Sequence, residues 1–149
     1  MSRKAALPSS AGYSGRPLPE KLGYKAGQTA LFIALPEDLS ALATAVHFAA
    51  VAREARWSAA LPARRFDLIH AFTTAKTDLD TRLVALQNAL KPDGMIWVSW
   101  PKKAARVATD LTEDVVRELA LPLGLVDVKV CAVDDVWSGL KLVVRKELR

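Results

Sequence analysis

An apolar run in the middle of the chain, Met95 to Trp100, limits the folds that this sequence can adopt. Its residues favour β-strands, and a run without polar alternation is typical of a strand that is covered on both faces. Pro92-Asp93-Gly94 before the run predicts a turn, and Pro101 ends the run. The sequence therefore predicts a central strand of a parallel sheet, with Lys102 and Lys103 at its carboxyl end.

Periodic segments on either side of this run predict further strands and helices. Strands are expected at residues 29–35, 46–52, 66–72, 125–133 and 139–146. Three helices are expected, each with an apolar stripe that packs on the sheet. The first starts near residue 37 and carries Leu39, Leu42 and Val46. The second is capped by Thr77 or Asp78 and carries Leu79, Leu83, Leu86 and Leu90, and the third is capped by Asp110 and carries Leu111, Val115 and Leu119. Residues 46–52 also fit a helix, and we favour a strand because a parallel unit needs one there.

The spacing of these segments predicts the architecture. Residues 53–65 form a basic connection with room for one or two helical turns. The last two strands are joined by residues 134–138, which are too few for a crossover, so these strands form an antiparallel hairpin. We therefore expect a three-layer, Rossmann-like α/β fold with a mostly parallel sheet that ends in an antiparallel hairpin.

Composition limits the class of protein. With 149 residues, of which 51% are hydrophobic, the chain suits one domain. The single cysteine, Cys131, excludes an internal disulfide and favours a reducing compartment. No apolar run reaches the about 18 residues of a membrane span, and the N-terminus lacks the hydrophobic core of a secretory signal. We therefore expect a soluble, cytoplasmic protein.

Most of the net charge of +5 lies in residues 1–27, which hold five basic side chains and one acidic side chain, Glu20. We divide the chain into this basic arm and a single α/β domain of residues 28–149. The first ten residues should be mobile, and the rest of the arm should pack on the body, where we favour an extension over a sheet edge rather than a lid. Because the arm lacks a clustered basic stripe, nucleic-acid binding through it is only our third hypothesis.

A candidate ligand site lies where the parallel strands end. We expect that edge of the sheet to gather Glu37, Thr73, Thr74, Lys76, Trp100, Lys102 and Lys103. Ammonium groups and hydroxyls around an aromatic ring suit a phosphate or carboxylate ligand. The alternative interpretation is that the lysines are solvated and the threonines cap the next helix. We favour that alternative because no base or nucleophile is paired with the lysines.

The remaining reactive side chains point to structural roles. His47 and His70 are isolated and follow no metal-ligand spacing, so we expect no metal site. Cys131 lies within a strand pattern and should be an inert core thiol. Trp137, in the turn of the hairpin, fits either an anchor for a partner or a ring that folds back over the sheet edge. No catalytic residue is assigned.

Two resemblances add to these patterns. The string from Leu86 to Val98, LQNALKPDGMIWV, and the order of elements resemble the second half of S-adenosylmethionine-dependent methyltransferases. In that family a helix ending in L-K-P-G-G leads into the fifth strand, and an antiparallel hairpin follows. The strings AGYSG, WVSWPKK, TDLTEDVVRE and WSGLKL resemble, over nearly the whole chain, a small bacterial family known only as a domain of unknown function. That second resemblance implies no activity.

The first turn departs from the methyltransferase pattern. The family has a glycine-rich turn after the first strand and an acidic residue at the end of the second. Here the first turn is residues 34–38, ALPED, and Arg53 rather than an acid follows residues 46–52. We therefore expect no cofactor, because the sequence lacks the residues with which the family binds S-adenosylmethionine. The leading hypothesis is a non-catalytic interaction or ligand-sensing domain, which binds an unidentified protein or a small anion. The alternative is a small transferase with a nucleotide-type or anionic ligand at the strand ends.

Overall fold

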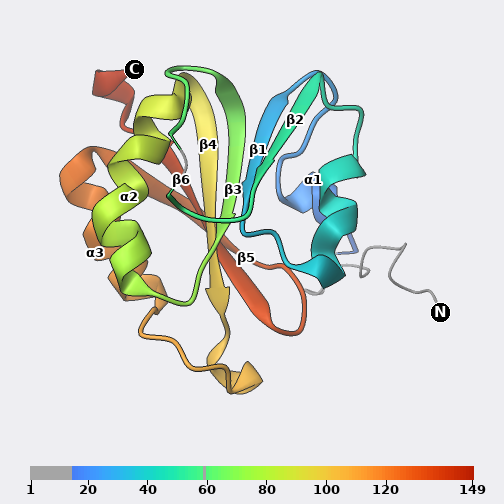
Figure 1. Cartoon of the computed structure of the whole chain (residues 1–149), viewed down its shortest axis with the longest axis vertical. Helices are drawn as coiled ribbons and strands as arrows, with labels where there is room; N and C mark the ends of the chain where they lie inside the picture. The colour runs from blue at the N-terminus through green and yellow to red at the C-terminus, as the bar shows by residue number, and fades with distance from the viewer. Residues whose placement is uncertain (1–14, 59) are drawn as a thin grey trace.

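A computed structural model describes residues 15–58 and 60–149 (Figure 1). Its strands are β1 Thr29–Ile33, β2 Ala50–Glu54, β3 Phe66–Phe72, β4 Leu90–Pro101, β5 Leu125–Ala132 and β6 Trp137–Val144. The α-helices are α1 Leu18–Lys21, α2 Lys76–Ala89 and α3 Glu113–Ala120. Shorter 3₁₀ segments are η2 Glu37–Thr44, η3 Lys103–Ala105, η4 Leu121–Leu123 and η5 Lys146–Leu148.

These strands form one six-stranded sheet in the order β2-β1-β3-β4-β6-β5. β1 pairs in parallel with β2 and β3, and β3 pairs in parallel with β4. β6 is antiparallel to both β4 and β5, so the hairpin closes the sheet as expected. The fold class predicted from the sequence is therefore confirmed. Among the described residues no helix has the length and hydrophobicity of a membrane span.

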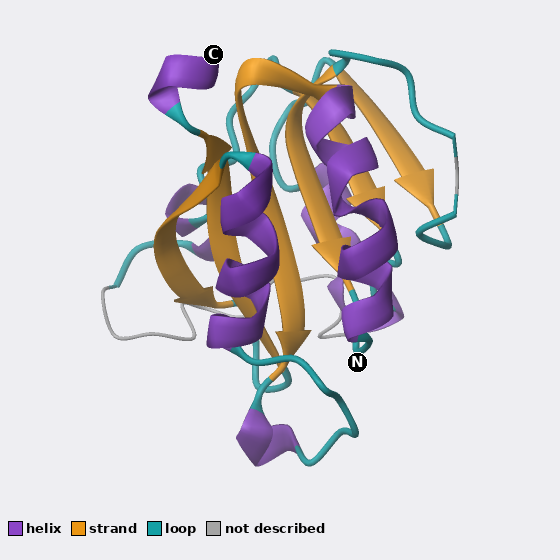
Figure 2. Ribbon diagram, turned by 90° about the vertical axis from the view of Figure 1, so that its left-hand side faces the viewer, coloured by secondary structure: helices purple, strands orange, loops and turns teal. Residues whose placement is uncertain are grey.

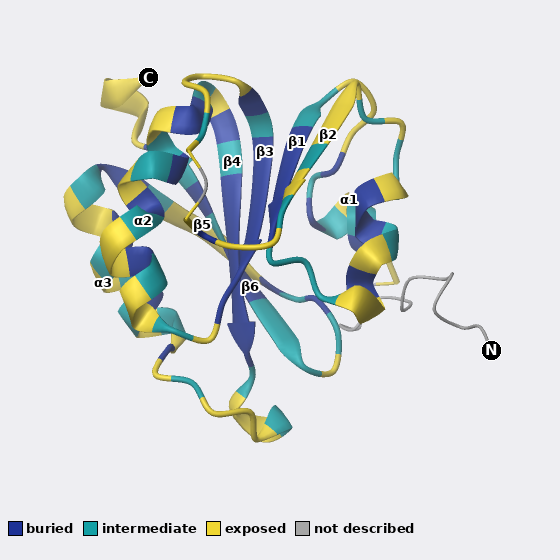
Figure 3. Ribbon diagram, in the orientation of Figure 1, coloured by how far each residue is buried: buried dark blue, intermediate teal, exposed yellow. Residues whose placement is uncertain are grey.

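The sheet separates two hydrophobic cores. Leu31 and Ile33 of β1 face the core that α2 and α3 cover, and these two helices lie side by side on that face (Figure 2). Ala30 and Phe32 face the opposite core, which α1 and η2 cover. Period-two alternation along a strand explains this division. Figure 3 shows the result: β3 and β4 are buried along most of their length, whereas the edge strand β2 is largely exposed.

Strand β4 is longer than the sequence predicts. It runs from Leu90 through Pro92–Gly94 to Pro101, so the expected turn is wrong. The pairing with β3 shifts register at this point, and the extra residues form a bulge. Gly94 is needed for close packing rather than for a turn, because a Cβ at this position would lie 2.9 Å from the Asp67 carbonyl oxygen.

The elements before β3 also differ in their bounds. β1 ends at Ile33 rather than residue 35, and the following helix is the 3₁₀ segment η2, which ends before Val46. The choice of a strand over a helix for residues 46–52 is right in kind, but β2 begins only at Ala50. Residues 47 and 49 bond instead with the loop before β1, through Gly27 N–H to His47 O and Ala49 N–H to Gln28 O. The helical turn expected in residues 53–65 is absent from the described part of that segment.

The helices after β3 begin at slightly different residues. Ala75 precedes α2 instead of the expected Thr77 or Asp78, while the leucine stripe of α2 is buried as expected. Thr112 caps α3, and its hydroxyl accepts the Val115 N–H. Because α3 starts two residues later than the Asp110 cap would imply, its fully buried residues are Val116 and Ala120 rather than Val115 and Leu119.

The described part of the arm lies on the α1 core. Leu18, Leu22 and Tyr24 are buried there, and the Trp97 indole N–H donates to the Leu22 carbonyl at 2.7 Å. Gly23 has φ +75, the left-handed conformation expected after a single helical turn. The expectation for the first ten residues falls outside the described residues, and the domain boundary at residue 27 stays a prediction.

Candidate functional site

A cleft of about 620 Å³ opens at the carboxyl ends of the first three strands. Ala34 lines it after β1, residues 55–58 after β2, and residues 72–74 at the end of β3. The chain leaves β1 towards the α1 core through η2 and leaves β3 towards the other core through α2. β1 and β3 are neighbours, so the cleft lies at the point where the crossovers change side. In open α/β sheets this switch point is the usual place for a ligand.

The polar groups of this switch-point cleft suit an anion. Two guanidinium-bearing residues, Arg56 and Arg82, line it together with the hydroxyl-bearing Ser58, Thr73, Thr74 and Thr81 and one carboxylate, Asp78. Arg82 is held in place because its Nε donates to the Trp57 carbonyl at 2.7 Å. The Trp57 ring is buried, and its Nε1 donates to the Phe72 carbonyl at 2.8 Å. The loop after β2 is thereby tied to both β3 and α2.

Thr73 organises the floor of the switch-point cleft. Its hydroxyl donates to Asp78 Oδ2 at 2.5 Å and accepts the Ala75 N–H at 3.0 Å. Its backbone N–H donates to the Ser99 carbonyl of β4. The threonine thus orders the loop before α2, but it does not cap the helix as the alternative interpretation expected, because the N-cap is Ala75 and no side chain caps α2. Trp137 also lines this cleft and packs edge-on against Phe72, with ring centroids 5.3 Å apart.

A second cleft of about 550 Å³ lies at the end of β4. Trp100, Lys102 and Lys103 line it, together with Thr109, Thr112 and Glu113. The Thr109 hydroxyl donates to the Thr74 carbonyl at 2.7 Å, so the walls of the two clefts are joined.

The structure therefore divides the residues that the sequence grouped. Thr73 and Thr74 belong to the switch-point cleft, whereas Trp100, Lys102 and Lys103 belong to the second cleft. Glu37 begins η2 and Lys76 begins α2, and neither is among the residues that line these two clefts. Five further residues line the switch-point cleft without having been predicted as site residues: Arg56, Trp57, Ser58, Thr81 and Arg82. Only the basic composition of residues 53–65 hinted at Arg56.

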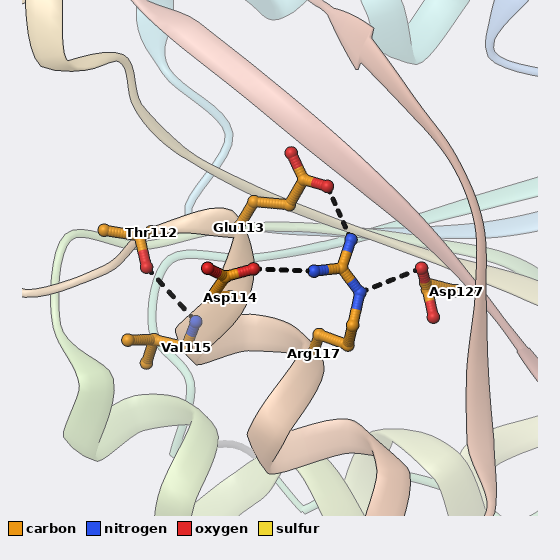
Figure 4. A network of polar contacts seen from close by, with 6 residues as sticks. All are labelled: Thr112, Glu113, Asp114, Val115, Arg117 and Asp127. Carbon is orange, nitrogen blue, oxygen red and sulfur yellow. Dashed lines mark hydrogen bonds and ion pairs between the residues drawn. The ribbon is translucent and has the colours of Figure 1, made fainter.

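One wall of the second cleft is fixed by the ionic network in Figure 4. Arg117 binds Glu113 and Asp114 on its own helix α3 and Asp127 on β5. Its hydrogen bonds with Glu113 and then Asp127 raise the pKa of Arg117, and the Arg117 hydrogen bond lowers the pKa of Asp127. The network attaches α3 to the sheet and holds Glu113 at the cleft.

The backbone after β1 keeps a glycine-like conformation without a glycine. Ala34 has φ +55, in the left-handed region that disfavours residues with a Cβ by about 1–2 kcal/mol. Its N–H donates to the Glu54 carbonyl at 2.8 Å, and Pro36 two residues later has no N–H to offer a ligand. Glu54 is the last residue of β2, so an acidic residue does close this strand and our contrary expectation is wrong.

A buried polar chain lies below the clefts, in the α1 core. His70 Nδ1 lies 2.6 Å from the Tyr24 hydroxyl, and its Nε2 lies 2.8 Å from Ser99 Oγ. All three residues are buried, and burial lowers the pKa of His70 to about 3, so the ring is neutral. His70 is therefore a satisfied structural histidine, as expected, and it links the arm to β3 and β4.

Comparison with solved structures defines the class of fold. A methyltransferase dependent on S-adenosylmethionine from Aquifex aeolicus matches with a TM-score of 0.66 and 17% identity, over 84% of this chain and 87% of that one. 1,6-Didemethyltoxoflavin-N1-methyltransferase from Burkholderia thailandensis matches with a TM-score of 0.57 and 16% identity, over 87% of this chain and 75% of that one. A phospholethanolamine N-methyltransferase from Haemonchus contortus matches with a TM-score of 0.64 and 12% identity, over 93% of this chain and 54% of that one.

The fold is accordingly the Rossmann-like fold of S-adenosylmethionine-dependent methyltransferases. The chain belongs to the family described as "Protein of unknown function (DUF3052)", which it matches over residues 68–146, more than half of its length. The solved structures confirm the first resemblance in fold, and the family match confirms the second over residues 68–146; the string AGYSG lies outside the matched residues. No protein with a curated description matches the chain.

Proposed function

We propose that this protein is a non-catalytic ligand-binding domain that takes a small anionic molecule in the switch-point cleft. The observation that carries the proposal is the lining of that cleft. Arg56 and Arg82 supply positive charge, and the Ser58 and Thr74 hydroxyls supply hydrogen-bond donors, at the site where α/β sheets usually bind ligands. The other two hydroxyls of the lining already donate within the protein, Thr73 to Asp78 and Thr81 to the Thr77 carbonyl. A guanidinium group binds phosphate or carboxylate through two parallel hydrogen bonds, which favours a ligand with such a group.

The same cleft lacks the features that would support methyl transfer. The resemblance implies a glycine-rich turn that lets the backbone approach the cofactor, and here Ala34 places a Cβ on the cleft wall. Pro36 removes one of the backbone donors that such a turn would offer. No histidine or cysteine is among the residues that line either described cleft, and the two carboxylates of the linings already have partners: Asp78 accepts from the Thr73 hydroxyl, and Glu113 is paired with Arg117.

The residues after β1 therefore do not fit S-adenosylmethionine in the manner of the family. We infer that the domain senses or holds its anion and passes the signal through a change in stability or shape. Trp137 would report occupancy, because its ring forms part of the cleft and packs on Phe72.

Thermal denaturation with a panel of anions tests this function. Inorganic phosphate, pyrophosphate, adenosine monophosphate and adenosine diphosphate are the probes, with the full chain. A ligand at about 100 times its Kd stabilises the folded state by about 2.7 kcal/mol, which raises the Tm of a domain of this size by about 5–10 °C. The gain should disappear in the Arg82→Gln variant and persist in Arg65→Gln, which removes an exposed charge outside the cleft. If no probe shifts the Tm at millimolar concentration, the proposal is wrong.

A small transferase is the second candidate, and Glu54 is the observation that favours it. The resemblance implies that an acidic residue closing the second strand holds the ribose hydroxyls of the cofactor, and Glu54 is in that place. Fluorescence quenching of Trp137 by S-adenosylhomocysteine separates the candidates. Saturable quenching that is lost in Glu54→Gln would favour the transferase, and unchanged fluorescence favours the non-catalytic domain.

A further inference from the structure

Two lysines of the closing hairpin lie side by side on the face of the sheet that carries α1. Lys129 of β5 and Lys141 of β6 are directly paired in the antiparallel register, so their side chains share one face. Lys141 is also paired with Trp97 of β4, whose indole binds the carbonyl of Leu22 at the end of α1. The hairpin lysines therefore lie next to the α1 segment.

That segment contributes two more lysines. Lys21 is the last residue of α1, and Lys25 follows the buried Tyr24. Burial lowers the pKa of Lys141, and the positive charges of Lys129 and Lys25 lower it further. Lys21 and Lys129 both act electrostatically on Cys131, which is paired with Gly139 on the same face. Lys21, Lys25, Lys129 and Lys141 thus form one cluster, which we call the lysine face.

The lysine face has no acidic partner within the part of the chain that the structure describes. None of its four ammonium groups forms an ion pair there. Residues 1–14 contain no aspartate or glutamate, and they add Arg3 and Lys4 to the same end of the chain. Like charges directly opposite each other on a sheet are destabilising. Folding therefore gathers positive charge on this face without compensating it.

The geometry points to the lysine face as a binding surface for the phosphate backbone of nucleic acid. Its lysines come from α1, the loop after it, β5 and β6, and none of them lines either cleft. Such a spread fits an extended polyanion better than a small ligand. Lysine is depleted at protein–protein interfaces, whereas protein–nucleic acid interfaces are strongly basic. An acidic protein segment is therefore the less favoured occupant.

The basic residues of the arm are dispersed along the chain, so the sequence alone favours other functions over nucleic-acid binding. The register of β5 and β6 adds Lys129 and Lys141 to Lys21 and Lys25, and only the fold brings the two pairs together. The lysine face shares no residue with the lining of the switch-point cleft, so nucleic-acid binding is tested independently of the proposed function.

Fluorescence anisotropy with a labelled duplex and a labelled single strand of about 20 nucleotides tests the inference, over about 50–200 mM salt. We expect the full chain to bind both with a Kd in the micromolar range at the lowest salt. The Lys129→Gln/Lys141→Gln variant should bind about tenfold more weakly or worse, and its plot of log K against log salt should be shallower by about two. Its Tm should be unchanged or higher, because two opposed positive charges are removed.

The matched control removes two charges elsewhere. Arg53 is exposed on the opposite edge strand β2, and Arg65 is exposed before β3. Arg53→Gln/Arg65→Gln should keep the wild-type affinity and salt slope. The inference is overturned by absence of binding at the lowest salt, by an equal loss in the control variant, or by poly-glutamate binding as tightly as the oligonucleotides. The last result would assign the face to an acidic protein.

Discussion

Acidification should destabilise this protein through His70, because its imidazole is buried in the neutral form. The ring lies between the Tyr24 hydroxyl and the Ser99 hydroxyl and stacks on Phe72, with centroids 4.4 Å apart. The Tyr24 pKa is raised well above its usual value, first by burial and then by the charge of Cys131, so this hydroxyl keeps its proton. Within the described residues, protonated His70 would be a buried cation without a carboxylate partner.

The size of the effect follows from the two pKa values of His70. Folding lowers the pKa from 6.5 to about 3, so between these values the unfolded chain binds one proton more than the folded chain. The contribution of neutral His70 to the free energy of unfolding should be fully present above about pH 6.5. Below that pH, the free energy of unfolding should fall by about 1.4 kcal/mol per pH unit. Between about pH 6.5 and about pH 4.5, where most carboxyl groups are still ionised, the loss is about 2–3 kcal/mol. That is a large part of the stability of a typical domain.

Urea denaturation followed by tryptophan fluorescence measures this dependence at several pH values. The His70→Gln variant should be less stable at neutral pH, because part of the buried chain loses its partner, but its stability should change little over the same range. His47→Gln is the matched control, since His47 is exposed and should leave the wild-type dependence intact. A wild-type slope below about 0.5 kcal/mol per pH unit, or the same slope in His70→Gln, would show that His70 does not cause the acid sensitivity.

Two further substitutions test backbone and packing claims. Ala34→Gly should raise the free energy of unfolding by about 0.5 kcal/mol, because relief of the left-handed strain exceeds the added chain entropy; a lower urea midpoint would contradict this. Gly94→Ala should lower it by about 1–3 kcal/mol, because the new Cβ would meet Leu90 and the Asp67 carbonyl oxygen within 3 Å. A neutral result in urea denaturation would show that the bulge in β4 has more room than its contacts indicate.

The fold could be predicted from the sequence because composition and spacing determine which segments are buried and how they can be connected. An unbroken apolar run such as Met95–Trp100 is stable only between two covering layers, and it is the centre of the sheet. The leucine stripe of α2 and the short connection between β5 and β6 predicted a helix and a hairpin in the same way. Irregular features could not be predicted from composition and spacing. The Pro92–Gly94 segment has the composition of a turn, but the pairing of β4 with β3 absorbs it as a bulge.

The candidate sites depended on contacts between distant segments, which the sequence does not encode locally. Arg82 reaches the switch-point cleft because the loop after β2 folds back and binds it through the Trp57 carbonyl. Lys102 and Lys103 were placed at the correct end of β4, but they line the second cleft, whereas Thr73 and Thr74 after β3 line the switch-point cleft. The lysine face depends on strand register in the same way.

We propose that the methyltransferase fold is kept here without its methyl-donor site. Isothermal titration of the full chain with S-adenosylmethionine measures whether that site is present. We predict no saturable heat at millimolar concentrations of the methyl donor, because Ala34 and Pro36 occupy the turn where backbone would have to approach it. Saturable binding with a Kd in the low micromolar range, lost in Glu54→Gln, would contradict the claim.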